Sequence, residues 1–266
     1  MSAVGRIWQT NARRGTSIAV TLRPGVFFPD WAAIRTPSAE EALTAILSNI
    51  RLLERWDGYG EEEDCVRQAI VRGLVSLGHA PDQVWLVQHT GLKRGRVAEL
   101  IDRLVSRDLV VRDESTNAII GAYPLTTRPT EHHVRLPRRM VYAMCAVDAL
   151  GAGAMVGADV AIESRCRACG AAIRIATEQG GTALDRVAPS TTVVWTGIRY
   201  KNGCAATSIC TTIAFFCTDA HLEEWRQVNH PDTKGFRLTP DEAMQVGRAV
   251  FAPVLKPAQG SKEERT

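Results

Sequence analysis

The chain has 266 residues, 45% of them hydrophobic and 23% charged, which is typical of a globular protein with a buried core and excludes a wholly disordered one. Its 32 basic and 29 acidic residues give a net charge of +3, too small by itself to indicate a nucleic-acid or membrane partner. No apolar run reaches the roughly 18 residues of a membrane span, and the first residues lack the apolar core of a secretion signal, so we expect a cytoplasmic protein.

The first part of the chain is predicted to be a basic extension followed by helices. Residues 1–37 contain five arginines and one acidic residue, Asp30, and predict a partly irregular extension. Ser38 and Glu41 have the spacing of a capping box, which satisfies free N–H groups at a helix start. Apolar residues at the helical period predict helices over about 38–53, 64–77 and 81–89, and a fourth from just after Gly91 to Val105.

The last three of these helices, with short strands at 109–111 and 118–120, have the pattern of a winged helix-turn-helix. We therefore predict a helical winged-helix-like module over residues 38–135. Basic residues near the start of its last helix, Lys93, Arg94 and Arg96, keep a metal-responsive DNA-binding regulator as an alternative function. Acidic residues interrupt this basic surface, so we expect no nucleic-acid partner. They are Asp82, Glu99, Asp102, Asp108 and the run at 61–64.

The second part of the chain is predicted to mix helices and strands. The composition of residues 138–150 predicts a buried helix that ends in a glycine-rich segment. Strands are expected at 159–163, 171–176, 191–195 and 210–216, helices at 220–228 and 239–251, and a flexible tail at 254–266. The whole therefore predicts an α+β protein whose second domain, residues 136–253, is mixed α/β with a small, mainly antiparallel sheet.

The seven cysteines are the residues from which we expect chemistry, because an odd number at uneven spacing does not indicate a disulfide framework. Cys145 and Asp148 stand three positions apart on the predicted helix, so a soft thiolate ligand and a proton carrier share one face. From this spacing alone, a packed thiol beside a surface carboxylate is the better-supported interpretation.

A second cysteine pattern is the turn formed by Cys166, Cys169 and Gly170, which is half of a zinc-ribbon motif. Cys204 and Cys210, the candidates for the other half, are separated by five residues, outside the usual two to four. A structural zinc at Cys166 and Cys169, or a redox-active dithiol, is therefore only an alternative interpretation. The remaining patterns predict packed thiols and a solvated histidine loop, and comprise Cys65, Cys204, Cys217 and the pair His132–His133.

Several of these residues recur in the order of a known family. The first motif is Arg138-Arg139-x-x-Tyr142-Ala143-x-Cys145-Ala146-x-Asp148-Ala149-Leu150. Three more follow it along the chain: Ser164-x-Cys166 with Gly170, Ser208-x-Cys210 leading into Phe215-Phe216, and Glu223-Glu224-Trp225. In order and spacing this combination resembles the organomercurial (alkylmercury) lyase family over roughly residues 64–251. The helical module likewise resembles the N-terminal part of those enzymes.

The resemblance implies that residues 136–253 are a catalytic domain that cleaves carbon–mercury bonds, giving a hydrocarbon and Hg(II). In the family's scheme, carried onto this sequence, Cys145 and Cys210 bind the mercury, and Asp148 relays a proton to the departing carbon. It implies an organomercurial substrate, no required cofactor and no membrane partner. External small thiols, or a mercuric reductase, would take over the Hg(II) in mercury detoxification.

Two positions depart from the family pattern. Thr211 stands where a second cysteine is common, and Met144 stands where a tryptophan is common. With Tyr142 and Ile209, these residues are the candidate walls of a substrate pocket. Changed walls leave open the cleavage of another organometal, or a non-catalytic metal-binding member of the family. Cys166 matches a family position, whereas Cys169 does not.

Overall fold

In the computed structural model, which describes residues 18–230 and 232–255, the helices of the first half form where the apolar periodicity predicts them. They are α1 (Pro37–Asn49), the single turn α2 (Leu52–Arg55), α3 (Glu61–Leu77), α4 (Gln83–Thr90) and α5 (Arg94–Ser106). The predicted capping box at Ser38 is wrong, because Thr36 caps α1 by accepting from the Ala39 N–H at 3.4 Å. Pro37 fills the first helical position, where its missing N–H is not needed.

The described part of the basic extension, residues 18–37, is regular rather than irregular. It contains a hairpin of β1 (Val20–Arg23) and β2 (Val26–Phe28) and the short 3-10 helix η1 (Trp31–Ala33). Arg23 holds the hairpin in place, because its guanidinium pairs with Asp64 on α3 at 2.9 Å and donates to the Pro253 carbonyl at 2.7 Å. Residues 1–17 of the extension and 256–266 of the predicted tail lie outside the described residues.

The predicted helix over residues 138–150 is wrong in its first half. That stretch is the strand β7 (Met140–Ala143), and the helix α6 (Ala146–Val156) begins only after Cys145. In β7 Val141 and Ala143 are buried, whereas Met140 is exposed and Tyr142 is half-buried, which is the two-residue alternation of a strand. An apolar run of this length does not by its periodicity distinguish a strand from a buried helix.

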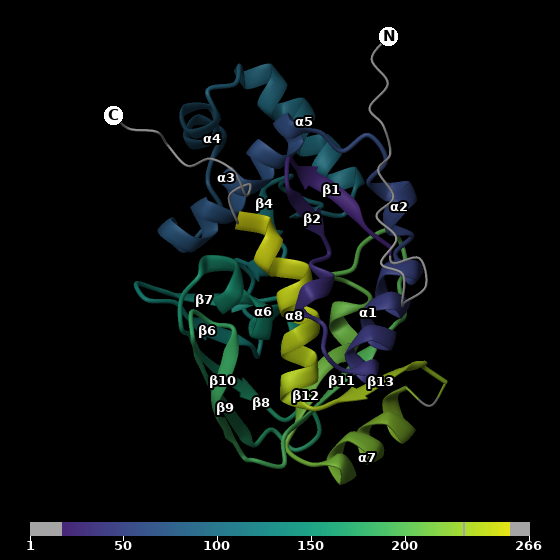
Figure 1. Cartoon of the computed structure of the whole chain (residues 1–266). Helices are drawn as coiled ribbons and strands as arrows, with labels where there is room; N and C mark the ends of the chain where they lie inside the picture. The colour runs from purple at the N-terminus through teal and green to yellow at the C-terminus, as the bar shows by residue number, and fades with distance from the viewer. Residues whose placement is uncertain (1–17, 231, 256–266) are drawn as a thin grey trace.

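Two antiparallel sheets accompany the helices (Figure 1), which confirms the α+β class. One has eight strands in the order β10-β9-β8-β6-β7-β5-β4-β3, and the other has three in the order β12-β11-β13. The eight are β3 (Val110–Arg112), β4 (Ile119–Ala122), β5 (Leu125–Thr126), β6 (His133–Arg135), β7, β8 (Ala161–Arg165), β9 (Ala172–Glu178) and β10 (Ala183–Ala188). The three are β11 (Val193–Gly197), β12 (Ile213–Phe216) and β13 (Gly235–Leu238).

The larger sheet joins both halves of the chain. The hairpin β3–β4 follows α5 as predicted, but β5 continues it into β7 of the second half. The predicted division at 135/136 falls between β6 and β7, which pair with each other. The domain boundaries and the winged-helix description of residues 38–135 both stay predictions.

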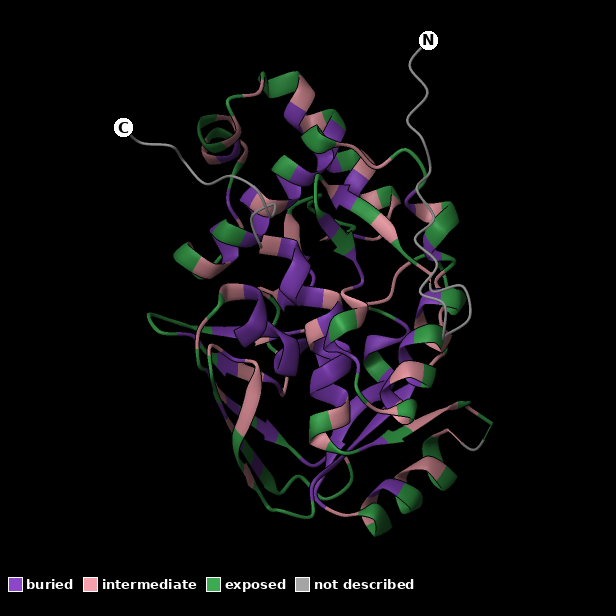
Figure 2. Ribbon diagram, viewed as in Figure 1, coloured by how far each residue is buried: buried purple, intermediate pink, exposed green. Residues whose placement is uncertain are grey.

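The core lies where α6 crosses the last helix, α8 (Pro240–Leu255), in the middle of the molecule (Figures 1 and 2). The residues of α6 from Ala146 to Met155 are all buried. The two helices approach so closely that a Cβ on Gly247 would lie 2.6 Å from the Val147 carbonyl oxygen, and one on Gly151 would lie 2.5 Å from the Gly247 carbonyl oxygen. Glycine at these positions therefore sets how deeply the start of α6 is held in the core.

A second buried feature is His132, which is not in a solvated loop as predicted. Its side chain is 1% exposed, its Nδ1 lies 2.9 Å from the Ser164 hydroxyl, and its ring meets the edge of Phe215. Burial, reinforced by the charge of Arg167, lowers the pKa of His132 to about 3. The ring is therefore neutral in the folded protein throughout the physiological range.

We expect Gly247→Ala to destabilise the protein by about 1–3 kcal/mol or more, because the new methyl group meets backbone atoms of α6 that cannot rotate away. Urea unfolding measures the change. Gly95→Ala is the control, since its Cβ meets nothing within 4 Å and alanine favours a helix. Equal stability of the two variants would contradict this close packing.

The depressed pKa of His132 predicts a loss of stability in acid. The unfolded chain takes up a proton at this residue near pH 6.5 and the folded chain only near pH 3, so the contribution of His132 is complete above pH 6.5 and falls as the pH drops toward 3. The slope contributed is at most about 1.4 kcal/mol per pH unit. The free energy of unfolding, measured by urea unfolding between pH 4 and 7 for the wild type and for His132→Gln, checks this. The same dependence of this free energy on pH in both proteins would refute the prediction.

Candidate active site

Cys145 and Asp148 meet at the start of α6. Cys145 is the N-cap, with an extended backbone, and its sulfur accepts the Asp148 N–H at 3.5 Å. The turn after the cap therefore carries the Asp148 carboxylate back toward the thiol. Both side chains are buried, with exposed fractions of 1% and 4%.

Cys210 reaches the same place from a distant part of the chain. It begins the 3-10 helix η2 (Cys210–Thr212), just before β12, and is 5% exposed. Its thiol lies 3.9 Å from an Asp148 carboxylate oxygen. One ligand atom from each of Cys145, Asp148 and Cys210 lies within 4.8 Å of the other two. The structure thus brings together the three residues that the sequence singled out, and we call them the thiol–carboxylate cluster.

Burial sets the protonation of this cluster. It raises the pKa of Asp148 to about 7, against the opposing effect of hydrogen bonds from both cysteines. It also raises the pKa of the Cys145 thiol, while the hydrogen bond with Cys145, followed by burial, raises that of Cys210 well above its ordinary value. At neutral pH both sulfurs are therefore protonated thiols, and Asp148 is close to the midpoint of its titration. The resting cluster carries little charge, as expected for groups taken out of water.

The segment that carries Cys210 is held by a network that the sequence did not predict. Asp108, in a left-handed turn after α5, accepts from the hydroxyls of Tyr123 and Tyr200 at 3.0 and 2.9 Å and from the Ala205 N–H at 2.8 Å. The Tyr123 hydroxyl in turn accepts the Ala206 N–H at 2.8 Å. The Cys210 N–H then donates to the Ala205 carbonyl at 2.9 Å, so these residues position Cys210.

The same segment is also held by Arg167. The guanidinium donates to the Thr211 carbonyl at 3.1 Å and pairs with Glu131 at 2.6 Å, and the Arg167 N–H donates to the Phe215 carbonyl. Arg167 lies between the two cysteines of the C-x-x-C turn. The C-x-x-C turn is therefore hydrogen-bonded, through Arg167, to Thr211, the residue after Cys210.

The four candidate pocket residues differ in their surroundings. Ile209 is buried next to Cys210, whereas the Thr211 side chain is exposed and donates to the Ser208 carbonyl. Tyr142, in β7, meets His133 edge-on, and the Met144 methyl group lies over Gly121. A cavity of about 840 Å³ lies elsewhere, over α3, and no cluster residue lines it.

The other predicted site residues divide into two groups. Cys65 is exposed and Cys204 half-buried, and neither belongs to a metal-binding group of the described residues. Cys166 and Cys169 do meet further ligands, but these are Cys217 and His221 rather than Cys204 and Cys210. Cys217 is therefore not simply a packed thiol. Its separation of three residues from His221 was the signal available in the sequence.

The basic residues of α5 are partly neutralised. Arg96 pairs with Glu62 at 2.6 Å and with Glu99 at 2.7 Å, and Arg94 donates to the Gln83 side chain. This use of Arg96 gives no support to a phosphate-binding surface at the start of α5. No helix in the described ranges is both long and apolar enough to cross a membrane.

Comparison with known proteins gives consistent results. The family model for alkylmercury lyase matches residues 125–252. An alkylmercury lyase of Bacillus cereus is 30% identical over 220 residues, which cover 82% of this chain and 97% of that protein. One from Pseudomonas putida is 30% identical over 148 residues, or 55% of this chain and 66% of that protein. The crystal structure of the mercury-bound form of MerB2 superposes with a TM-score of 0.65 at 26% identity, covering 78% of this chain and 98% of that one.

Tyr123→Phe should destabilise the protein by about 1–3 kcal/mol, because it leaves the Ala206 N–H without an acceptor and Asp108 without one donor. Urea unfolding measures this, and the rate at which a thiol reagent modifies Cys210 should rise as its segment loosens. Tyr142→Phe is the matched control, since in the described part of the chain the Tyr142 hydroxyl has no hydrogen-bond partner. An unchanged Cys210 reaction rate in Tyr123→Phe would refute the positioning role.

Proposed function

The chain belongs to the alkylmercury lyase family, and on that premise we propose that it cleaves carbon–mercury bonds by protonolysis at Cys145, Asp148 and Cys210. The observation that carries the proposal is the thiol–carboxylate cluster, with two sulfurs and a carboxylate oxygen within 4.8 Å of one another. Two metal–sulfur bonds of about 2.3 Å, as for zinc, span about 4.6 Å, which is close to that limit and puts both sulfurs within reach of one mercury ion.

The chemistry needs these three groups. A carbon–mercury bond is weakly polar and inert in water, so its cleavage requires soft donors that raise the electron density on mercury and a proton for the carbon. Thiolate sulfur is the soft ligand among protein side chains, and only its deprotonated form binds well. A carboxyl group with a pKa near 7 gives up and regains a proton readily at neutral pH.

The protons balance if both cysteines begin as thiols. The first thiol binds the organomercurial through sulfur, and its proton leaves with the ligand that was displaced from mercury. The second thiol binds next and passes its proton to Asp148, which lies 3.9 Å from the Cys210 sulfur. Asp148 gives this proton to the carbon as the carbon–mercury bond breaks. The products are a hydrocarbon and Hg(II) bound to Cys145 and Cys210, and Asp148 is again a carboxylate.

Release of the Hg(II) closes the cycle. Two small external thiols displace the protein sulfurs from mercury and return them to the thiol form, so this step needs no cofactor. A mercuric reductase would serve as a downstream acceptor of the released ion. In this proposal the protein acts in the cytoplasm, where such thiols are abundant.

The walls of the pocket set which organic group fits. Met144 is a flexible side chain where relatives commonly have a tryptophan, and Ile209 adds an apolar surface beside Cys210. Thr211 stands where relatives commonly have another cysteine, and its hydroxyl is bound to the Ser208 carbonyl, so no third thiol follows Cys210. We propose mercury rather than another metal as the substrate, since both sulfur ligands are retained.

Asp148→Asn should lower the turnover of methylmercury or phenylmercury with excess thiol by about 100-fold or more, because the amide cannot relay the proton. The variant keeps both sulfurs, so it should still form a protein–organomercury adduct that mass spectrometry detects without hydrocarbon release. Cys145→Ser and Cys210→Ser should abolish turnover and weaken the adduct.

Cys204→Ser and Cys65→Ser are the controls, since neither residue belongs to the cluster, and both should turn over substrate at the rate of the wild type. Methane or benzene measured by gas chromatography, with Hg(II) in the protein fraction, follows the reaction. Normal hydrocarbon release by Asp148→Asn or Cys145→Ser would overturn the assignment.

A further inference from the structure

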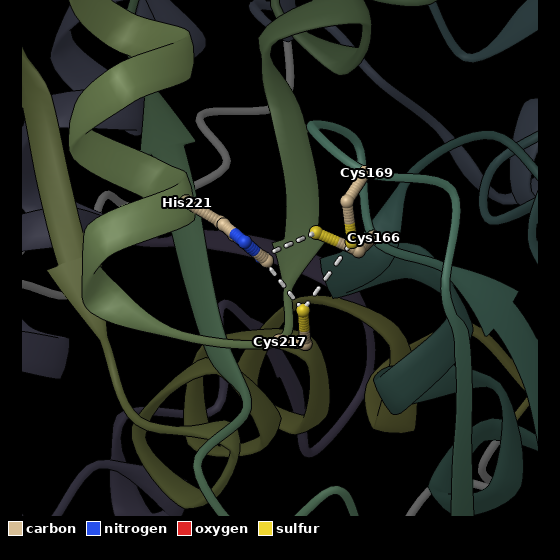
Figure 3. A group of neighbouring side chains, drawn as sticks. All are labelled: Cys166, Cys169, Cys217 and His221. Carbon is tan, nitrogen blue, oxygen red and sulfur yellow. Dashed lines mark hydrogen bonds between the residues drawn. The ribbon is translucent and has the colours of Figure 1, made fainter.

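Four metal-ligating side chains meet at a second place, separate from the thiol–carboxylate cluster (Figure 3). They are Cys166, Cys169, Cys217 and His221, and one ligand atom from each lies within 4.8 Å of the other three. The Cys169 and Cys217 sulfurs are 3.6 Å apart, and His221 Nδ1 lies 3.8 Å from the Cys166 sulfur and 2.9 Å from the Cys217 sulfur.

These separations are close to those of a tetrahedral zinc site. With zinc–sulfur bonds of about 2.3 Å and zinc–nitrogen bonds of about 2.05 Å, tetrahedral geometry puts sulfurs about 3.8 Å apart and a sulfur about 3.5 Å from the nitrogen. Two of the three measured separations agree within about 0.3 Å. The third, from Cys217 to His221, needs an increase of about 0.6 Å, which small side-chain rotations supply.

The first pair of ligands lies on a turn built for close approach. Cys166 and Cys169 lie in the connection between β8 and β9, where the Gly170 N–H donates to the Cys166 carbonyl at 2.8 Å. Gly170 has a φ of +73°, which glycine adopts without strain, so the chain reverses directly after Cys169. Both sulfurs therefore point toward the same centre, as Figure 3 shows.

The second pair comes from the end of a strand and the start of a helix. Cys217 follows β12 directly, and His221 lies in the first turn of α7 (Asp219–Asn229), whose N-cap is Thr218. The Thr218 hydroxyl accepts the His221 N–H at 3.2 Å, which fixes the turn that brings the imidazole over the cysteine. The spacings of two residues in the first pair and three in the second fall within those of structural zinc sites.

We propose that Cys166, Cys169, Cys217 and His221 bind one structural Zn²⁺ ion. Three thiolates and one imidazole suit zinc, and four protein ligands leave no position open for a substrate, as in sites that stabilise folds rather than catalyse. The site is distinct from the thiol–carboxylate cluster, since the two share no residue.

The ion would stabilise the part of the molecule that carries Cys210. It would tie the β8–β9 connection of the large sheet to the end of β12 in the small sheet. β12 begins three residues after Cys210 and ends at Phe216, directly before Cys217. Arg167, between the first two ligands, donates to the Thr211 carbonyl. Zinc loss should therefore loosen the position of Cys210 without touching the cluster itself.

The test is the metal content of the full chain, expressed in zinc-supplemented, mercury-free medium and measured by mass spectrometry of the metal. We expect one zinc ion per chain in the wild type, and a loss to near zero in Cys169→Ser and His221→Ala. Cobalt(II) exchanged into the site should show thiolate-to-cobalt charge-transfer absorption. Removing zinc with a chelator should lower the thermal unfolding midpoint, and returning zinc should restore it, which avoids relying on variants that fail to fold.

Two matched controls separate this proposal from the catalytic one. Cys204→Ser and His230→Ala should keep one zinc ion, since neither residue belongs to the group. The double variant Cys145→Ser with Cys210→Ser should also keep it while turning over no substrate. A wild-type protein that contains no zinc, and whose unfolding midpoint is the same with and without added zinc, would overturn the proposal. A Cys169–Cys217 disulfide found by mass spectrometry, or loss of zinc in the double variant, would overturn it too.

Discussion

The removal of two thiols and a carboxyl group from water is the constraint on which this molecule depends. Cys145, Asp148 and Cys210 are almost completely buried, and burial favours the uncharged form of each. Thiolates in such a place become stable only when a positive ion arrives to bind them. The same burial that keeps the resting cluster nearly neutral therefore couples deprotonation of the sulfurs to the binding of a soft metal.

Enclosing this cluster requires rigid support for both of its halves. Cys145 and Asp148 are held by α6, which lies against α8 at the contact between Gly151 and Gly247. Cys210 begins the short 3-10 helix η2, and side-chain hydrogen bonds from distant residues hold the segment around it. Asp108 and Arg167 supply such bonds, and each of them reaches a backbone atom of this segment, the Ala205 N–H and the Thr211 carbonyl. The position of Cys210 therefore depends on residues that touch no substrate.

Much of the fold could be predicted from local sequence patterns, because the apolar periodicity of a helix is visible within one continuous segment. This periodicity predicts α3, α4 and α5. The prediction of a helix at β7 is wrong, because a short apolar run has the same composition in a buried helix and in a buried strand. The convergence of Cys145 with Cys210 came from the family resemblance, since no local rule connects residues so far apart. The Asp108 network and the pairing of Cys166 with His221 join distant segments as well, and only the folded chain reveals them.

The order of strands in the large sheet also bears on how a substrate enters. β6, from the first half of the chain, lies between β7 and β8, while β7 lies between β6 and β5. Strands of the two halves therefore alternate in this part of the sheet. A movement that separates the halves would break three strand pairings at once, β5–β7, β6–β7 and β6–β8. Hinged opening of the whole molecule is costly for this topology. A substrate therefore has to reach the buried cluster while these three strand pairings stay intact.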